Sequence, residues 1–322
     1  PRWARSPHGP TTPAAGFVGR GAELAALHAR WQDALAGHGG TVIVRGEAGI
    51  GKSRLVRRFT ATRNARGASA AFAVFASPFH GDEPLQPLIA ALRGMVGQGG
   101  GGEAGRLERL RRLLLLNNAG AEEETRFAAL AELLGLAGHR EAAQLEGMTP
   151  VRLRTLTLEA VVSAVARIAR SRPLLLLVED AHWLDPTTLD LVRHLAREAT
   201  AGCVLLVLTA REEFPLPSGD EWPSCVTLEL KGLQEREAVQ LYAAVSGQDL
   251  RSTRVGHEIA LRTGCVPLFV EEVAHALREQ RSSGAVATKP SAIPSSLHEC
   301  LAARLDRAGP TKSVAQAAAV LG

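Results

Sequence analysis

Eight residues near the start of the chain have the types and spacing needed to hold a phosphate chain: Gly46, Glu47, Ala48, Gly49, Ile50, Gly51, Lys52 and Ser53, followed by Arg54. A β-prone run precedes them and a helical pattern follows, which is the strand, G-x-x-x-x-G-K-S, helix order of a phosphate-binding loop. Glycines let the backbone bend and bring its N–H groups close to the phosphates. Lys52 would contact the β- and γ-phosphates, and the Ser53 hydroxyl would ligate Mg²⁺. We therefore expect residues 46–54 to bind a nucleoside triphosphate.

Two carboxylates follow a run that is apolar throughout, residues 173–178. Glu179 and Asp180 come directly after this run. The pattern is typical of a central parallel strand whose carboxyl end contributes to a functional site. Carboxylates there would hold the Mg²⁺ shell and orient a water for attack on the γ-phosphorus. The first acid of such a pair usually serves the metal and the second polarises water. Here Glu comes first and Asp second, so the division of roles stays open.

A guanidinium is expected at the same edge of the sheet. Arg211 ends the sequence Val-Leu-Thr-Ala-Arg at 207–211, which reads as the end of a neighbouring strand. Arg211 could bind the γ-phosphate with two hydrogen bonds. In an Arg-rich chain it could equally be a surface residue at a strand end.

Three further features each have two interpretations. Asp185, before Pro186, could cap a helix or belong to the metal shell. His182 and Trp183 could pack under the site, and a lone His is more often structural than catalytic. Pro267 could be the first residue of a helix or could lay an apolar face on the adenine ring.

The elements that position these residues follow from hydrophobic periodicity. From Leu233 onward the pattern is helical throughout. We predict a linker over 1–15, an α/β P-loop nucleotide-binding domain over 16–231, a helical domain over 232–292 and a further domain that starts at 293–322. The predicted strands lie at 41–45, 70–76, 173–178, 203–209 and 225–230; the predicted helices after them lie at 234–246, 252–262, 267–280, 294–306 and 311–320.

The composition narrows the class of protein. The net charge is +4, but the sequence has no basic block of five or six residues, so this charge is weak evidence for nucleic acid binding. No apolar run is long enough for a membrane span and no secretion signal opens the chain, so a cytoplasmic location is expected. The four cysteines, which lack metal-ligand spacing, agree with reduced thiols there. Because the chain starts with Pro and stops inside an Ala-rich helical pattern, we expect it to be a piece of a longer protein.

In this order the motifs resemble the signal-transduction ATPases with numerous domains, the STAND branch of the AAA+-like P-loop NTPases. This resemblance rests on four segments: FVGRGAEL (17–24), GEAGIGKSRLV (46–56), VEDAHWLD (178–185) and LTAR (208–211). More narrowly, the chain resembles the ATPase module that follows class III adenylate/guanylate cyclase domains in bacterial regulators. The narrower resemblance rests on SPFHGDEPLQPLI (77–89), VPLFVEEV (266–273) and the segment 293–322.

The resemblance implies a five-stranded parallel sheet between helices, then a helical bundle and the start of a winged-helix domain. It also implies that Val18 and Arg20 line the adenine pocket and that Pro267 closes it. One departure concerns the turn before Pro267: the family usually has Gly where this chain has Cys265, and Gly264 stands one place earlier.

The function implied is a regulatory switch that binds ATP or ADP with Mg²⁺ and hydrolyses ATP slowly. Its partners would be linked output and sensor domains and, when ATP is bound, another copy of the chain. No membrane partner is expected. One alternative is the ATPase region of a LuxR-type transcription regulator, in which a distant helix-turn-helix would bind nucleic acid. Another is a scaffold that holds ADP with little turnover. A metabolic kinase would need an acceptor site and a lid, for which the sequence has no signal.

Overall fold

The computed structural model describes residues 17–63, 69–80, 83–97, 102–116, 120–200, 202–216, 221–247 and 254–282, and a few positions between 299 and 317. Its contacts divide these residues into two compact units. The first contains Ala25–Arg45 and Phe59–Leu228, and the second contains the segments up to Leu24, Gly46–Arg58 and from Glu229 onward.

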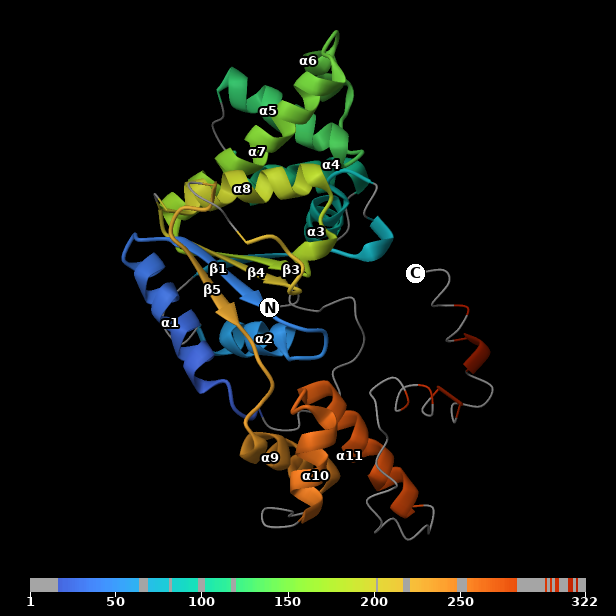
Figure 1. The fold of residues 1–322 in the computed structure, drawn as a ribbon. Coiled ribbons are helices and arrows are strands. Elements are labelled where there is room, and N and C mark those ends of the chain that lie inside the picture. Colours follow the sequence, from blue (N-terminus) through green and yellow to red (C-terminus); the bar gives the residue numbers. More distant parts are fainter. Residues whose placement is uncertain are drawn as a thin grey trace. The chain divides into compact units, whose positions relative to one another are not determined.

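A five-stranded sheet forms the centre of the first unit (Figure 1). Its spatial order is β2-β3-β4-β1-β5, and the pairs β2–β3, β3–β4 and β1–β4 are parallel. All residues of β3 and β4 are buried, as expected of central strands covered on both faces. The strands are β1 (Gly40–Arg45), β2 (Ala70–Phe75), β3 (Leu174–Glu179), β4 (Val204–Ala210) and β5 (Cys225–Glu229).

Helices cover both faces of this sheet. Helices α3 (Gln86–Val96), α7 (Pro150–Ser171) and α8 (Pro186–Thr200) lie on one face, and α1 (Gly21–Leu35) lies on the other (Figure 1). One large apolar core joins the three helices to alternate residues of β3 and β4. The 22-residue helix α7 begins with a side-chain cap: Thr149 Oγ1 accepts the Arg152 N–H at 3.3 Å, and Pro150 is the first helical residue.

Three short helices separate α3 from α7. They are α4 (Gly102–Leu113), α5 (Ala121–Leu133) and α6 (His139–Leu145). Helix α5 packs on α6 and α7 through a small apolar cluster of Ala128, Ala129, Leu145 and Leu156.

Beyond the phosphate loop and the start of α2 (Lys52–Thr62), the described part of the second unit consists mainly of helices. It contains α9 (Glu235–Ser246), α10 (Arg254–Thr263) and α11 (Pro267–Ser282). Buried side chains of α9, α10 and α11, with Tyr242 among the largest, form one core.

The predicted α/β fold with a five-stranded parallel sheet and following helices is confirmed. The segment 293–322, where we predicted the start of a winged helix, lies almost wholly outside the described residues. In the part of the chain that the structure describes, no helix has the length and apolar content to cross a bilayer.

Asp185 is the residue whose role the structure decides. Its side chain is 3% exposed and caps α8: Oδ1 accepts the Thr188 N–H at 2.9 Å, and Oδ2 accepts the Thr188 hydroxyl. Oδ2 also accepts the N–H of Leu85, at 3.3 Å, just before α3. The helix-cap interpretation therefore describes Asp185.

We expect Asp185→Ala to lower the free energy of unfolding by about 2–3 kcal/mol, because it removes a helix cap and leaves buried donors without an acceptor. Denaturant titration followed by circular dichroism measures this change. Asp190→Ala on the same helix is the matched control, because the Asp190 side chain is 45% exposed and its ion pairs with Arg154 and Arg193 lie near the surface. Equal losses in the two variants would contradict the structural role of Asp185.

Candidate functional site

The phosphate loop bends through backbone conformations that favour glycine. Gly46, Gly49 and Gly51 have φ angles of 152°, 78° and 100°. At Gly49 an added Cβ would lie 2.9 Å from the Cβ of Leu268, and at Gly46 it would lie 2.6 Å from the Leu230 carbonyl oxygen. Glycine is therefore required at both positions by backbone angle and by space.

Lys52 stands at the first position of α2 and folds back over the loop. Its ammonium donates to the carbonyl oxygens of Gly46 at 2.7 Å and Glu47 at 2.8 Å, and the residue is only 7% exposed. The positive end of the α2 dipole and the buried ammonium both favour an anion at this loop.

The start of α11 contacts the phosphate loop within the second unit. The Leu268 N–H donates to the Gly49 carbonyl at 3.2 Å, and Pro267 is the first residue of the helix. Arg54, which follows Ser53, forms an ion pair with Glu271 one turn further along α11. The loop and α11 are therefore joined by a backbone hydrogen bond and a charged pair.

The two N-terminal residues implied to line the adenine pocket also belong to the second unit. Val18 packs against the core of α9, α10 and α11. Arg20 has a φ of 62° and donates to the carbonyl oxygens of Ile50 at 3.1 Å and Lys231 at 2.5 Å. The structure thus brings Val18, Arg20, the phosphate loop and Pro267 into one unit, and Arg20 ties the loop to the segment before α9.

The departure at Cys265 leaves a left-handed turn in place. Gly264 and Cys265 both have positive φ, 55° and 57°. The Cys265 carbonyl accepts the Leu233 N–H at 2.9 Å, and its own N–H donates to Ala260 at 3.2 Å. Burial raises the pKa of the Cys265 thiol, and the nearby Glu235 carboxylate adds to that rise. A non-glycine residue thus occupies the left-handed position at a cost of about 1 kcal/mol.

In the first unit, Glu179 and Asp180 end β3 beside the end of β4. Glu179 is the last strand residue and is 7% exposed. Asp180 adopts φ 58° and ψ 45°, and its N–H donates to Thr209 Oγ1 at 2.9 Å. The Asp180 carboxylate makes no capping hydrogen bond to the 3-10 turn Ala181–Trp183 that follows.

Arg211 directly follows β4 and lies over the ring of Trp183, with 5.5 Å from the guanidinium carbon to the ring centroid. This distance is within the range of a cation–π contact. Trp183 thus packs against a predicted site residue. The structure therefore places Glu179, Asp180 and Arg211 together at the carboxyl ends of two adjacent strands.

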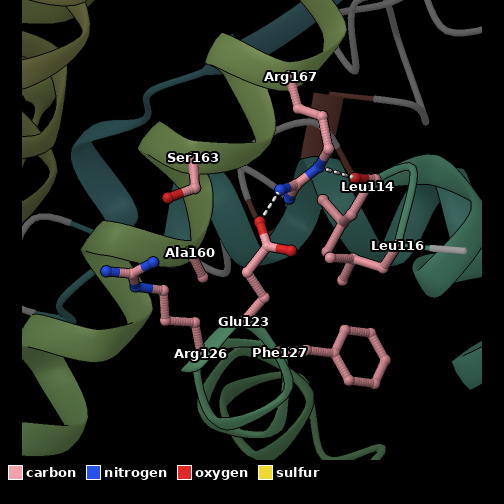
Figure 2. A pocket seen from close by; sticks show the side chains of 8 residues that line it. All are labelled: Leu114, Leu116, Glu123, Arg126, Phe127, Ala160, Ser163 and Arg167. Carbon is pink, nitrogen blue, oxygen red and sulfur yellow. Dashed lines mark hydrogen bonds and ion pairs between the residues drawn. The ribbon is translucent and has the colours of Figure 1, made fainter. Parts of the chain in front are cut away.

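The first unit also has a pocket between α5, α7 and the residues that follow α4. The charges of this pocket do not suit a phosphate. Leu114, Leu116, Phe127 and Ala160 supply its apolar wall. Arg167 forms an ion pair with Glu123 and donates to the Leu114 carbonyl at 2.9 Å (Figure 2). The other arginine, Arg126, is bonded to Glu122 at 2.6 Å and Glu159 at 3.1 Å. Both guanidinium groups are thus neutralised by carboxylates.

Two residues that the sequence reasoning did not select contact the predicted ones. Thr209 accepts the Asp180 N–H, and Glu271 pairs with Arg54. The sequence could have indicated Thr209, because side chains two residues apart in a strand face the same side, and Thr209 stands two residues before Arg211. Nothing in the sequence indicated Glu271, since its partner Arg54 lies more than 200 positions earlier.

Comparisons with known proteins give a curated relative, solved structures and a matching family model. The chain is 29% identical over 320 residues to an uncharacterised protein of Rhizobium meliloti (strain 1021), a match that covers 95% of this chain and 30% of the relative. The chain therefore spans about 30% of the length of this curated relative.

Among solved structures, Drosophila ORC bound to DNA superposes with a TM-score of 0.52 at 13% identity, covering 95% of this chain and 65% of that one. A STAND protein with a tetratricopeptide repeat sensor from Pyrococcus horikoshii gives a TM-score of 0.43 at 16% identity, covering 82% of this chain and 30% of that one. At these identities the ORC superposition supports the fold alone.

The AAA ATPase domain family matches residues 16–208, more than half of the sequence. The match includes the phosphate loop, both acids of β3 and most of β4. The chain therefore belongs to the AAA ATPase domain family, whose members are nucleotide-hydrolysing P-loop ATPases that typically bind nucleotide with Mg²⁺.

Proposed function

We propose that this chain is an ATP-binding, slowly hydrolysing switch within a larger signalling protein, with residues 16–231 as its nucleotide-binding domain, 232–292 as its helical domain and 293–322 as the start of a winged helix. The observation that carries the proposal is the buried Lys52 ammonium, held over a glycine-rich loop at the start of α2. An anion is the ligand that such a loop, helix end and ammonium favour.

The residues of the loop fit a triphosphate. Its glycines keep the backbone free of side chains, and Ser53 stands in the first turn of α2, where its hydroxyl would ligate Mg²⁺. Among the described residues no cluster of three or more His, Cys, Asp or Glu side chains could hold a metal ion by itself. A magnesium ion would then share oxygens of the phosphates with Ser53 and one or two acids, which is its usual mode in ATPases.

The roles proposed for the β3 and β4 residues come from the sequence motifs that they occupy. We assign Glu179 and Asp180 to the magnesium shell and the attacking water, and Arg211 to the γ-phosphate. Bound Mg²⁺–ATP would supply the phosphoryl group; the two acids would hold the metal and orient the water, and Arg211 would neutralise negative charge on the γ-phosphate.

The contacts of the loop with α11 favour a switch. ATP shifts an equilibrium only through its differential contacts with two states, and a change from 1:99 to 99:1 needs about 5.5 kcal/mol. Lys52, Arg211 and Mg²⁺ would supply charge-assisted contacts to the γ-phosphate. The Arg54–Glu271 pair and the bond from Leu268 to Gly49 would carry the change into α11.

Within this function, resemblance favours a cyclase-type regulator with linked sensor and output domains, acting in the cytoplasm and assembling when ATP is bound. A LuxR-type transcription regulator is the second candidate, supported by the same core motifs. A cyclase domain ahead of residue 1 in the full-length gene would support the first candidate, and a distant helix-turn-helix would support the second.

We expect Lys52→Ala to weaken ATP and ADP binding at least about 100-fold, which is ~2.7 kcal/mol, because it removes the ammonium held in the loop. Isothermal titration calorimetry or retention of labelled nucleotide measures this loss. Lys231→Ala is the matched control, since its side chain is exposed. Unchanged affinity in Lys52→Ala would refute the binding site.

Glu179→Gln and Asp180→Asn should each retain ATP binding, and at least one should lower kcat by about 100-fold or more, because a carboxylate that orients water would be lost. Phosphate release measures the rate, and the larger loss identifies the acid that serves the water. Asp190→Asn, an exposed acid on α8, should match the wild type. Equal, background-level rates in the wild type and both site variants would instead favour the scaffold that holds nucleotide without turnover.

A further inference from the structure

The backbone of Asp180 is held by the side chain of Thr209. Its N–H donates to Thr209 Oγ1 at 2.9 Å, across from the end of β3 to β4. Thr209 is 1% exposed and lies in the parallel register between β4 and β1, opposite Val44. The acceptor is therefore a hydroxyl on a central strand, which has little freedom to move.

Asp180 needs such a restraint because its conformation is an uncommon one. At φ 58° and ψ 45° it is left-handed, a region that costs a non-glycine residue free energy. This conformation ends β3 and starts the 3-10 turn, in which the Trp183 N–H donates to the Asp180 carbonyl at 2.9 Å. The backbone angles at Asp180 set the direction in which its carboxylate leaves the chain.

A second contact joins the same turn to the same strand end. The ring of Trp183 lies under the guanidinium of Arg211, two residues after Thr209. The turn that carries the acid and the segment that carries the arginine are therefore linked at Asp180 and at Trp183. Neither predicted site residue can shift without disturbing a contact to the other strand.

We propose that Thr209 is a positioning residue for ATP hydrolysis: its buried hydroxyl accepts the Asp180 N–H and holds the left-handed turn that orients the Asp180 carboxylate. This inference rests on the proposed hydrolytic role of Asp180. Thr209 acts through Asp180 and contributes to turnover rather than to nucleotide affinity.

The test compares Thr209→Val, which keeps the side-chain shape and removes the acceptor, with Thr209→Ser, which keeps the hydroxyl. Thr41→Val is the matched control, because Thr41 is also fully buried, on β1, and its hydroxyl oxygen has no hydrogen-bond partner among the described residues. For each protein, kcat, KM and the Kd for ATP are measured, together with hydrogen exchange of the Asp180 amide.

Thr209→Val should lower kcat about 10-fold or more and leave KM and Kd within about 3-fold, because only the orientation of a reacting group changes. The Asp180 amide should exchange about 10-fold faster or more in this variant. Thr209→Ser should restore both values to within about 3-fold of the wild type. Thr41→Val should match the wild type in every measurement.

Wild-type kcat in Thr209→Val, or an equal fall in Thr209→Ser, would overturn the positioning role. An equal fall in Thr41→Val would do so as well, because it would show a general effect of β-strand substitution. If the wild type itself binds ATP but turns over only at background, the proposed hydrolysis fails, and the positioning role fails with it. Should Thr209→Val not fold, as judged by circular dichroism, Thr209→Ala replaces it against Thr209→Ser with the same expectations.

Discussion

Parallel pairing of β1, β3 and β4 is the constraint on which the rest of the first unit depends. Because the strands run the same way in adjacent positions, their carboxyl ends reach one edge of the sheet. The residues at the ends of these strands are then neighbours although they are far apart in sequence: Glu179 ends β3, Asp180 follows it, and Arg211 follows β4. Strands β3 and β4 are buried along their whole length, so they are packed on both faces up to that edge.

The phosphate loop shows what close backbone packing requires of a sequence. Gly49 must admit Leu268 from α11, and Gly46 must admit the Leu230 carbonyl, so neither position has room for a side chain. Before α11 the chain instead accepts a non-glycine residue at positive φ, because Cys265 is held there by hydrogen bonds on its N–H and its carbonyl. The loop tolerates no such compromise, since there a Cβ meets fixed atoms.

Two acids five positions apart, Asp180 and Asp185, differ in role because their neighbours differ. Asp185 is buried and accepts hydrogen bonds from Thr188 and Leu85, so its carboxylate is committed to joining α8 and α3. Asp180 stands before a 3-10 turn but makes no capping hydrogen bond. Its backbone, and not its carboxylate, provides the structural connection, through Thr209. Only the acid whose side chain is not spent on capping fits a role in chemistry.

The sequence by itself predicted the strands, helices α9, α10 and α11, the parallel α/β fold and the phosphate loop, because these depend on local periodicity and on residues adjacent in the chain. It left Asp185 between two interpretations, and missed Thr209 as a partner of Asp180 and Glu271 as a partner of Arg54. Each of these depends on side chains brought together across strands or helices, from positions up to 217 residues apart. Local sequence patterns do not show which distant residues come into contact, so only the tertiary structure decided these partners.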